Sequence, residues 1–189
     1  MDGPTSMSAP FGEPQRLIAG GESAQLLDLG NGHVLKLFRE GVSDEMIARE
    51  SGASSYAEGC GVPTAAAIGQ WVWDGRRGIV YPRLEGGTLM DWIRRKPFRA
   101  GWALDRMGAM HAAMHQKSGG ALRPLKQVLA TDISHGPAPV ALQRAAIAYL
   151  NTLPEGHALI HGDFHLSNVM MTPQGMRVID WSKAASGHP

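Results

Sequence analysis

This chain contains little cysteine and carries almost no net charge. Its 189 residues contain a single cysteine, Cys60, which excludes an intramolecular disulfide and favours a reducing compartment, so we expect a cytoplasmic protein. The formal charge is only +1, from 18 Lys and Arg against 17 Asp and Glu residues. We therefore expect neither a nucleic acid nor an anionic membrane as partner. No apolar run approaches the roughly 18 residues needed to span a bilayer.

The N-terminus also lacks the features of a targeting segment. Residues 1–15 contain neither a basic start nor an apolar stretch of the kind found in signal peptides. They include three prolines and two glycines, so we expect a flexible tail. Hydrophobic residues make up 43% of the chain and charged residues 19%, a globular composition that predicts one domain or two small lobes sharing a cleft.

Apolar runs separated by turn signals predict a small antiparallel sheet in the first half of the sequence, interrupted by one helix. The strongest turn signal is Gly30-Asn31-Gly32, which lies between two apolar runs. Ser43 or Asp44 can cap the helix. We expect two short strands within 16–29, strands at 33–38, 65–73 and 77–84, and a helix at 44–58.

The pattern becomes helical after residue 84. The stretch Glu85-Gly86-Gly87 breaks the strand pattern and is a candidate hinge between two lobes. Thr88 can cap a short helix that follows it. We expect longer helices at 101–117 and 139–153 and strands at 158–160 and 176–179. The chain then divides into a tail (1–15), an N-terminal lobe (16–84) and a C-terminal lobe (85–189).

Three polar residues stand at fixed spacing around the last expected strand. Asp163 and Asn168 lie five residues apart, and Asp180 follows Asn168 by twelve residues at the end of a hydrophobic strand. Kinase-type sites need a carboxylate near the attacking hydroxyl, then an amide and a second carboxylate to hold magnesium. The spacing of the first pair equals that of Asp and Asn in the kinase catalytic loop.

This motif resembles that of a known family. The pattern His-Gly-Asp-x-His-x-x-Asn at 161–168, followed by Ile-Asp-Trp at 179–181, is similar to the aminoglycoside phosphotransferase and choline kinase-like small-molecule kinases. The resemblance implies their protein-kinase-like α+β fold, with a small antiparallel sheet and a helix in the first lobe and mostly helices in the second. It also implies transfer of the γ-phosphoryl group of ATP or GTP to a hydroxyl of a small molecule.

The resemblance assigns a role to each polar residue of the motif. Asp163 would be the catalytic base, and Asn168 and Asp180 would hold Mg²⁺. His161 and His165 match histidines of the family's catalytic loop, and we expect both to order that loop rather than to transfer protons.

The N-terminal half supplies the nucleotide-binding residues that a kinase needs. Such a site requires a strand lysine for the α- and β-phosphates and a helical glutamate that holds the lysine. Lys36 lies at the centre of an expected strand, and Glu50 lies 14 residues on in the expected helix. Gly21 and Ser23 lie in the small-residue turn where a phosphate-covering loop belongs, although this turn is not GxGxxG. By the resemblance, Tyr81 and Arg83 fall where the chain would bind adenine, mainly through backbone groups.

The C-terminal part departs from the family pattern. Family members continue through further helices that complete the second lobe and help to bind the acceptor, whereas nine residues follow Asp180 here. We therefore expect a truncated lobe, with uncovered apolar faces on helices 101–117 and 139–153 that favour self-association. Aminoglycosides, choline, sugars, homoserine and macrolides all stay open as acceptors.

Two other functions stay open. His161, Asp163 and His165 alternate, so on a strand they would share one face and could hold zinc in a metallohydrolase. That interpretation leaves Lys36 and Asn168 without a role. The other alternative is a catalytically inactive nucleotide-binding or interaction protein, because the acceptor lobe is unfinished.

Overall fold

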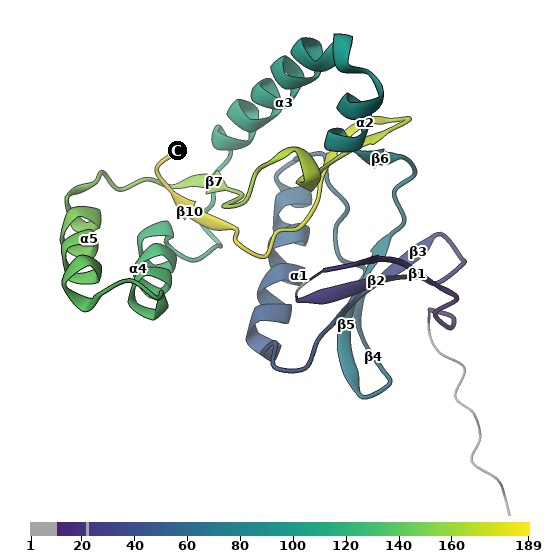
Figure 1. Cartoon of the computed structure of the whole chain (residues 1–189), viewed down its shortest axis with the longest axis horizontal. Coiled ribbons are helices and arrows are strands. Elements are labelled where there is room, and N and C mark those ends of the chain that lie inside the picture. The colour runs from purple at the N-terminus through teal and green to yellow at the C-terminus, as the bar shows by residue number, and fades with distance from the viewer. Residues whose placement is uncertain (1–10, 22) are drawn as a thin grey trace, which may run out of the picture.

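The N-terminal part is an antiparallel sheet with one helix packed on it (Figure 1). The computed structural model describes residues 11–21 and 23–189, and its first sheet has five strands in the order β1-β2-β3-β5-β4. Ile47 of the helix packs against Phe38 and Ile79 on one face of this sheet. The elements are β1 (Arg16–Gly20), β2 (Ala24–Asp28), β3 (His33–Phe38), α1 (Asp44–Gly59), β4 (Gly69–Trp73) and β5 (Arg76–Pro82).

These elements confirm the strands and the helix expected from the N-terminal sequence, with shifted ends for two strands: β4 begins later than expected, and β5 ends at Pro82 rather than at residue 84. Ser43 caps α1, since its Oγ accepts a hydrogen bond from the Met46 amide at 3.3 Å. The strand expected from residue 65 begins only at Gly69, because the chain just before it bonds elsewhere: the Ala67 amide donates to Ser54 Oγ of α1 at 3.1 Å.

The expected N-terminal tail is described only from residue 11. The ring of Phe11 packs against Trp71 of β4, and the Gln15 amide donates a hydrogen bond to the Asp28 carbonyl at 2.8 Å. Contacts with the sheet therefore begin before residue 16, and residues 1–10 lie outside the described residues.

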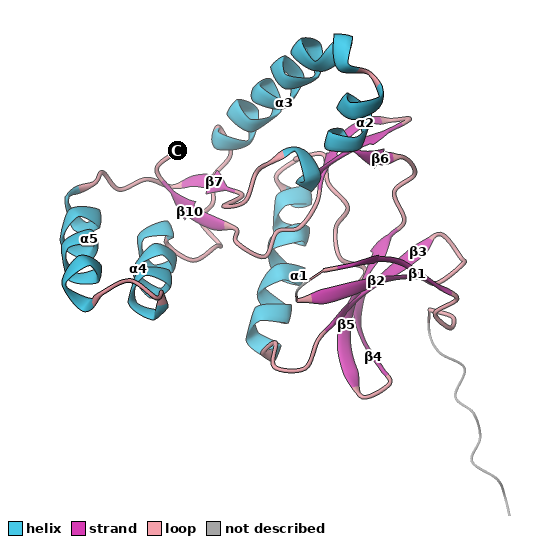
Figure 2. Cartoon of the chain, viewed as in Figure 1, coloured by secondary structure: helices cyan, strands magenta, loops and turns pink. Residues whose placement is uncertain are grey.

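The C-terminal part combines helices with two small sheets (Figure 2). Strands β6, β8 and β9 form one antiparallel sheet, and β7 pairs with β10. The α+β class, with a sheet first and mostly helices after it, is thus confirmed. The elements are β6 (Gly87–Thr88), α2 (Leu89–Arg95), η1 (Pro97–Arg99), α3 (Ala100–His115), α4 (Leu125–His135), α5 (Val140–Thr152), β7 (Ala158–Ile160), η2 (Leu166–Asn168), β8 (Val169–Thr172), β9 (Gly175–Val178) and β10 (Ala185–Gly187).

Helix α4 and strands β6, β8 and β10 were not expected from the sequence. α4 follows Pro124, has no side-chain cap and buries only Val128, so neither capping nor periodicity marks it. β8 and β10 have four and three residues and depend on their pairing with β9 and β7. β10 also has no β-branched or aromatic residue that would indicate a strand.

Glu85 and Gly86 connect the five-stranded sheet to the sheet of β6, β8 and β9, and Gly87, which was expected to break the strand pattern, is the first residue of β6. Gly86 has φ +119°, and a Cβ atom there would collide with the carbonyl group of Met171. Glycine is therefore required for the close approach of β6 to β8. The hinge function and the lobe boundary at residue 84 stay predictions.

The apolar face expected on the helix at 139–153 is mostly exposed in α5. Leu150 is buried, whereas the side chains of Leu142 and Tyr149 are 58% and 67% exposed. Self-association through this face stays a prediction. Within the described residues, every helix is too short or too polar to cross a membrane.

One hydrophobic cluster joins α1 to the C-terminal part. Its centre is Trp181, which follows the polar motif and is 1% exposed. Buried residues from α1, α3, β7 and β9 surround it, namely Ala53, Ala57, Met114, Leu159 and Val178. The two halves of the chain thus share one core at the place where the polar residues meet.

Candidate active site

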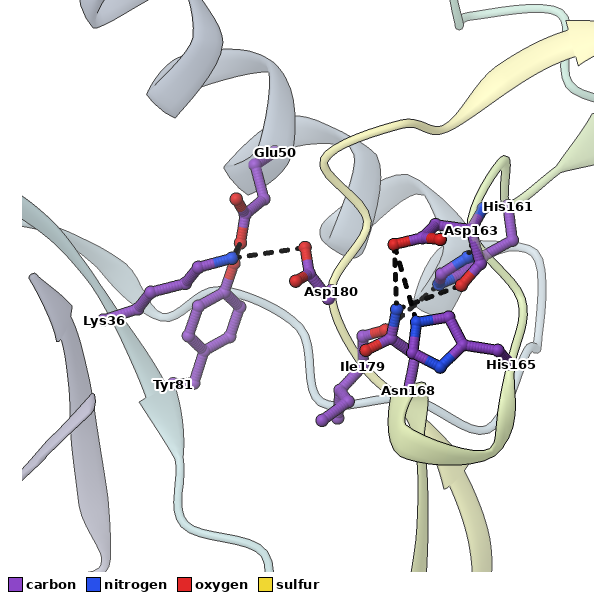
Figure 3. Close-up of polar contacts among 9 residues, drawn as sticks. All are labelled: Lys36, Glu50, Tyr81, His161, Asp163, His165, Asn168, Ile179 and Asp180. Atoms are coloured by element: carbon purple, nitrogen blue, oxygen red, sulfur yellow. Dashed lines mark hydrogen bonds and ion pairs between the residues drawn. The ribbon is translucent and has the colours of Figure 1, made fainter. Parts of the chain in front are cut away.

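Lys36 brings the two halves of the expected site together. It points from the middle of β3, and its Nζ lies 2.6 Å from Glu50 Oε1 and 3.2 Å from Asp180 Oδ1 (Figure 3). Glu50 comes from α1, whereas Asp180 follows β9, 144 residues after the lysine. A strand, a helix and a C-terminal loop therefore meet at one ammonium group.

Burial and mutual attraction set the charges of this triad. Burial raises the pKa of Glu50, whose side chain is 3% exposed, and the ammonium of Lys36 limits that rise. Burial alone would lower the pKa of Lys36, but the carboxylates of Glu50 and Asp180 outweigh it and raise this pKa. Lys36 is therefore a cation at neutral pH.

Asp180 is held as an anion. Burial raises the pKa of its carboxyl group, but Lys36 and hydrogen bonds from Ser182 outweigh burial, so that the pKa lies below its ordinary value. Its side chain is still about one-third exposed. An ionised and accessible carboxylate beside a lysine can bind a cation that accompanies phosphate groups.

The side chains of Tyr81 and Arg83 each pair with a carboxylate, on α1 and on β2 respectively. The Tyr81 hydroxyl donates to Glu50 Oε1 at 3.1 Å, and burial together with the charge of Glu50 raises the pKa of this phenol, so it stays a donor. The Arg83 guanidinium pairs with the Asp28 carboxylate, and its amide donates to the Gly32 carbonyl at 2.8 Å. The backbone contact with adenine expected for Tyr81 and Arg83 stays a prediction.

Gly21 and Ser23 lie at the turn between β1 and β2. The Gly21 amide donates to the Ala24 carbonyl at 2.8 Å, and the Ser23 carbonyl accepts from the Arg39 amide at 2.8 Å. Both residues are exposed, and Glu22 between them lies outside the described residues. The structure thus places them in a solvent-facing hairpin turn, and their contact with phosphate stays a prediction.

Asp163 is oriented by Asn168. The Asn168 Nδ2 donates to the Asp163 carbonyl oxygen at 3.0 Å and to Asp163 Oδ2 at 3.2 Å (Figure 3). Asn168 is itself fixed, because its carbonyl accepts a hydrogen bond from the Ile179 amide at 3.0 Å. The Asp163 side chain is about half exposed, so its carboxylate is both held and accessible.

His161 connects this loop to the residue before Asp180. Its Nε2 donates to the Ile179 carbonyl at 3.0 Å, and its Nδ1 accepts from the Asp163 amide at 3.2 Å. A carbonyl can only accept and an amide can only donate, so these partners determine the tautomer. Burial lowers the pKa of His161, which keeps the ring neutral at neutral pH.

His165 organises the short turn that ends at Asn168. Its Nδ1 accepts a hydrogen bond from the Ser167 amide at 3.2 Å, and its Nε2 lies 3.7 Å from Asp163 Oδ2. Both histidines thus use ring nitrogens for hydrogen bonds to backbone groups, of the loop and, for His161, also of Ile179. That they order the loop rather than transfer protons stays a prediction.

Comparison with known proteins identifies the family. A profile described as the phosphotransferase enzyme family matches residues 14–189. The chain belongs to this phosphotransferase family. The family includes the aminoglycoside phosphotransferase and choline kinase-like enzymes that the motif resembles, and membership implies phosphotransferase activity on a small molecule. A comparison with curated proteins finds no match.

The residues of this phosphotransferase fit Mg²⁺ better than zinc. Mg²⁺ takes one or two protein carboxylates and completes its shell with phosphates and water, which suits Asp180 and the remaining amide oxygen of Asn168. The zinc alternative required His161, Asp163 and His165 on one face, but the His161 ring is buried with both nitrogens in use. In residues 11–21 and 23–189, no three His, Cys, Asp or Glu side chains group closely enough to hold a metal.

The neutral state of His161 predicts a loss of stability in mild acid. In the folded protein the pKa of His161 lies below the ordinary value of 6.5. As the pH falls below 6.5, His161 is therefore protonated in the unfolded chain while it is still neutral in the folded protein, and this difference favours unfolding. We expect the thermal midpoint to fall over this range, measured by circular dichroism. His111 and His115 shift in the same direction, so the test is the difference between the wild type and His161→Asn.

The variant His161→Asn should show a shallower decline between pH 6.5 and about 5, whatever its stability at pH 7.5. His135→Asn, which changes an exposed histidine on α4, is the control and should keep the wild-type slope. Equal slopes for all three proteins would contradict the assignment of His161 as a neutral buried group.

Two contacts of the phosphotransferase site were not anticipated. The hydrogen bond from Tyr81 to Glu50 joins a β5 side chain to α1, and no local pattern indicates it. The indole of Trp181 donates to Thr64, a residue that the sequence patterns do not single out. The N–H group of a buried tryptophan usually has a hydrogen-bond acceptor. Trp181 in the sequence therefore predicts that an acceptor exists, but not which residue provides it.

Proposed function

We propose that this phosphotransferase moves the γ-phosphoryl group of ATP or GTP to a hydroxyl of a small molecule, with Mg²⁺ bound to the phosphates. The observation that carries the proposal is the position of Lys36 Nζ, which contacts Glu50 from one side of the site and Asp180 from the other. The Asn168 carbonyl accepts a hydrogen bond from the amide of Ile179, the residue before Asp180. The Asn168 side chain in turn orients the Asp163 carboxylate.

The N-terminal residues would bind the nucleotide. Lys36 would hold the α- and β-phosphates, and Glu50 keeps the lysine in place with Tyr81 as a second donor to the same carboxylate oxygen. The exposed turn that contains Gly21 and Ser23 would cover the phosphates with backbone amides.

The C-terminal residues would perform the transfer. Asp163 would accept the proton of the acceptor hydroxyl and direct its oxygen at the γ-phosphorus. Asp180 and Asn168 would bind Mg²⁺, which neutralises phosphate charge when bound. Because the transition state of phosphoryl transfer is loose, most of the rate gain would come from positioning and fixed charges.

The half-exposed Asp163 carboxylate supports an acceptor that approaches from solvent. We place the reaction in the cytoplasm, where nucleoside triphosphates are abundant, and the single cysteine, Cys60, supports that placement.

Calorimetric titration with ATP and with GTP, with and without Mg²⁺, tests the proposal. We expect binding with a dissociation constant of about micromolar order that depends on Mg²⁺, followed by ADP or GDP release when an accepted hydroxyl compound is added. Binding without turnover against any hydroxyl acceptor would favour the inactive nucleotide-binding alternative. A folded sample that binds neither nucleotide would contradict the proposal.

A further inference from the structure

The residue that follows Asp180 is held by a buried hydroxyl. Trp181 Nε1 donates a hydrogen bond to Thr64 Oγ1 at 2.9 Å, and Thr64 Oγ1 donates to the Val178 carbonyl at 2.6 Å. Thr64 and Trp181 are 3% and 1% exposed, so water does not compete for these bonds.

The two partners of this hydroxyl flank the Ile179–Asp180 pair. Val178 comes immediately before the pair and Trp181 immediately after it, so one oxygen atom holds both ends of a two-residue segment. Asp180 has φ +63°, a left-handed conformation that a residue other than glycine keeps only where the surrounding structure enforces it. The Thr64 hydroxyl supplies part of that enforcement.

Thr64 also belongs to the segment that connects the two halves of the site. It lies between α1, which carries Glu50, and β4, and its backbone forms a parallel bridge with Val178. The Val178 amide donates to the Pro63 carbonyl at 2.8 Å, and Arg177 donates to the Thr64 carbonyl at 3.3 Å. This segment is therefore attached to β9, the strand that leads to Asp180.

We propose that Thr64 is a positioning residue, whose hydroxyl sets the direction of the Asp180 carboxylate toward Lys36 and toward the Mg²⁺ of a bound nucleotide. This inference rests on the proposed function, because the position of the carboxylate is measured through nucleotide-bound magnesium. Because the Thr64 side chain is buried, its hydroxyl would act through Val178 and Trp181 rather than by contact with nucleotide or acceptor.

Thr64→Val tests the proposal, because valine keeps the shape and removes the hydroxyl. We expect nucleotide binding without Mg²⁺ to stay at the wild-type level, while the gain in affinity on adding Mg²⁺ falls by about 10- to 100-fold, as for other residues that orient metal ligands. Thr64→Ser restores the hydroxyl and should recover most of that gain. The measurement is calorimetry with ATP in the presence and absence of Mg²⁺.

Thr172→Val is the matched control. Thr172 is also buried, and its Oγ1 also donates to a carbonyl, that of Gly175 at 2.8 Å, and accepts one hydrogen bond, from the Gln174 amide. It lies at the opposite end of the β8–β9 hairpin from Val178. We expect Thr172→Val to lower the thermal midpoint as Thr64→Val does, but to keep the response to Mg²⁺.

Trp181→Phe provides a second variant should Thr64→Val fail to fold. It removes the indole N–H and keeps an aromatic ring, and we expect a smaller loss of the Mg²⁺ response. A wild-type response to Mg²⁺ that either folded variant retains in full would overturn the role of Thr64 and leave the proposed function intact. A wild-type chain that shows no response to Mg²⁺ would contradict the proposed function itself.

Discussion

Replacing Asp163 by asparagine is expected to lower the rate of phosphoryl transfer by at least about a hundredfold, because a side-chain amide of the same size cannot accept the proton of the attacking hydroxyl. The Asp163 carboxylate is half exposed and directed by Asn168, and neither residue belongs to the Lys36–Glu50 pair. The affinity for nucleotide with Mg²⁺ should therefore stay close to that of the wild type. The measurements are kcat with an accepted hydroxyl compound and the calorimetric dissociation constant of ATP.

Asp105→Asn is the control for this experiment. Asp105 lies exposed on α3, so its replacement should leave both quantities unchanged. A variant Asp163→Asn with full turnover would show that another group accepts the proton. Loss of nucleotide binding in that variant would instead show that Asp163 holds the nucleotide.

Lys36→Met is expected to reduce both function and stability. Lys36 Nζ lies within 3.2 Å of the carboxylates of Glu50 and Asp180, and its removal leaves these two acidic groups without their shared cation at the proposed phosphate site. Breaking a buried ion pair by removing one partner costs about 3 kcal/mol or more in the free energy of unfolding. Loss of one preorganised charge should lower kcat by about a hundredfold.

The double variant Lys36→Met with Glu50→Gln separates the two effects. It removes the unpaired buried carboxylate as well, so we expect urea denaturation to show part of the stability recovered while activity stays low. Lys126→Met is the matched control, since its side chain is 20% exposed against 17% for Lys36 and pairs with Glu155 at 2.8 Å. If the control lost as much activity as Lys36→Met, the assignment of Lys36 to the phosphates would be wrong.

Local signals in the sequence are enough to predict most of the elements that carry the site. Gly30-Asn31-Gly32 marks the turn before the strand of Lys36, and Ser43 marks the start of the helix of Glu50. The signals work because a turn or a cap depends on the few residues that form it. The same holds for the loop at 161–168, where the spacing of Asp163 and Asn168 allows the Asn168 amide group to reach the Asp163 carboxylate.

Elements without such signals were missed. α4 has no side-chain cap, and β10 exists only because its backbone pairs with β7. The exposed face of α5 is a different case. Helical spacing shows only that Leu142 and Tyr149 share a side of the helix, and their exposure was expected from the resemblance to the family rather than from the spacing.

The sequence alone was thus sufficient for the family, for the α+β class and for the identity of the polar residues in the motif, since each depends on residues close together in the chain. The tertiary structure decided which of them meet. Lys36 reaches Asp180 across 144 positions, and the hydroxyl of Thr64 holds Trp181 across 117. Contacts between residues so far apart in the sequence form because α1 and β9 pack against the buried side chain of Trp181. Such packing depends on the whole core and not on any one segment, so a local sequence pattern does not predict it.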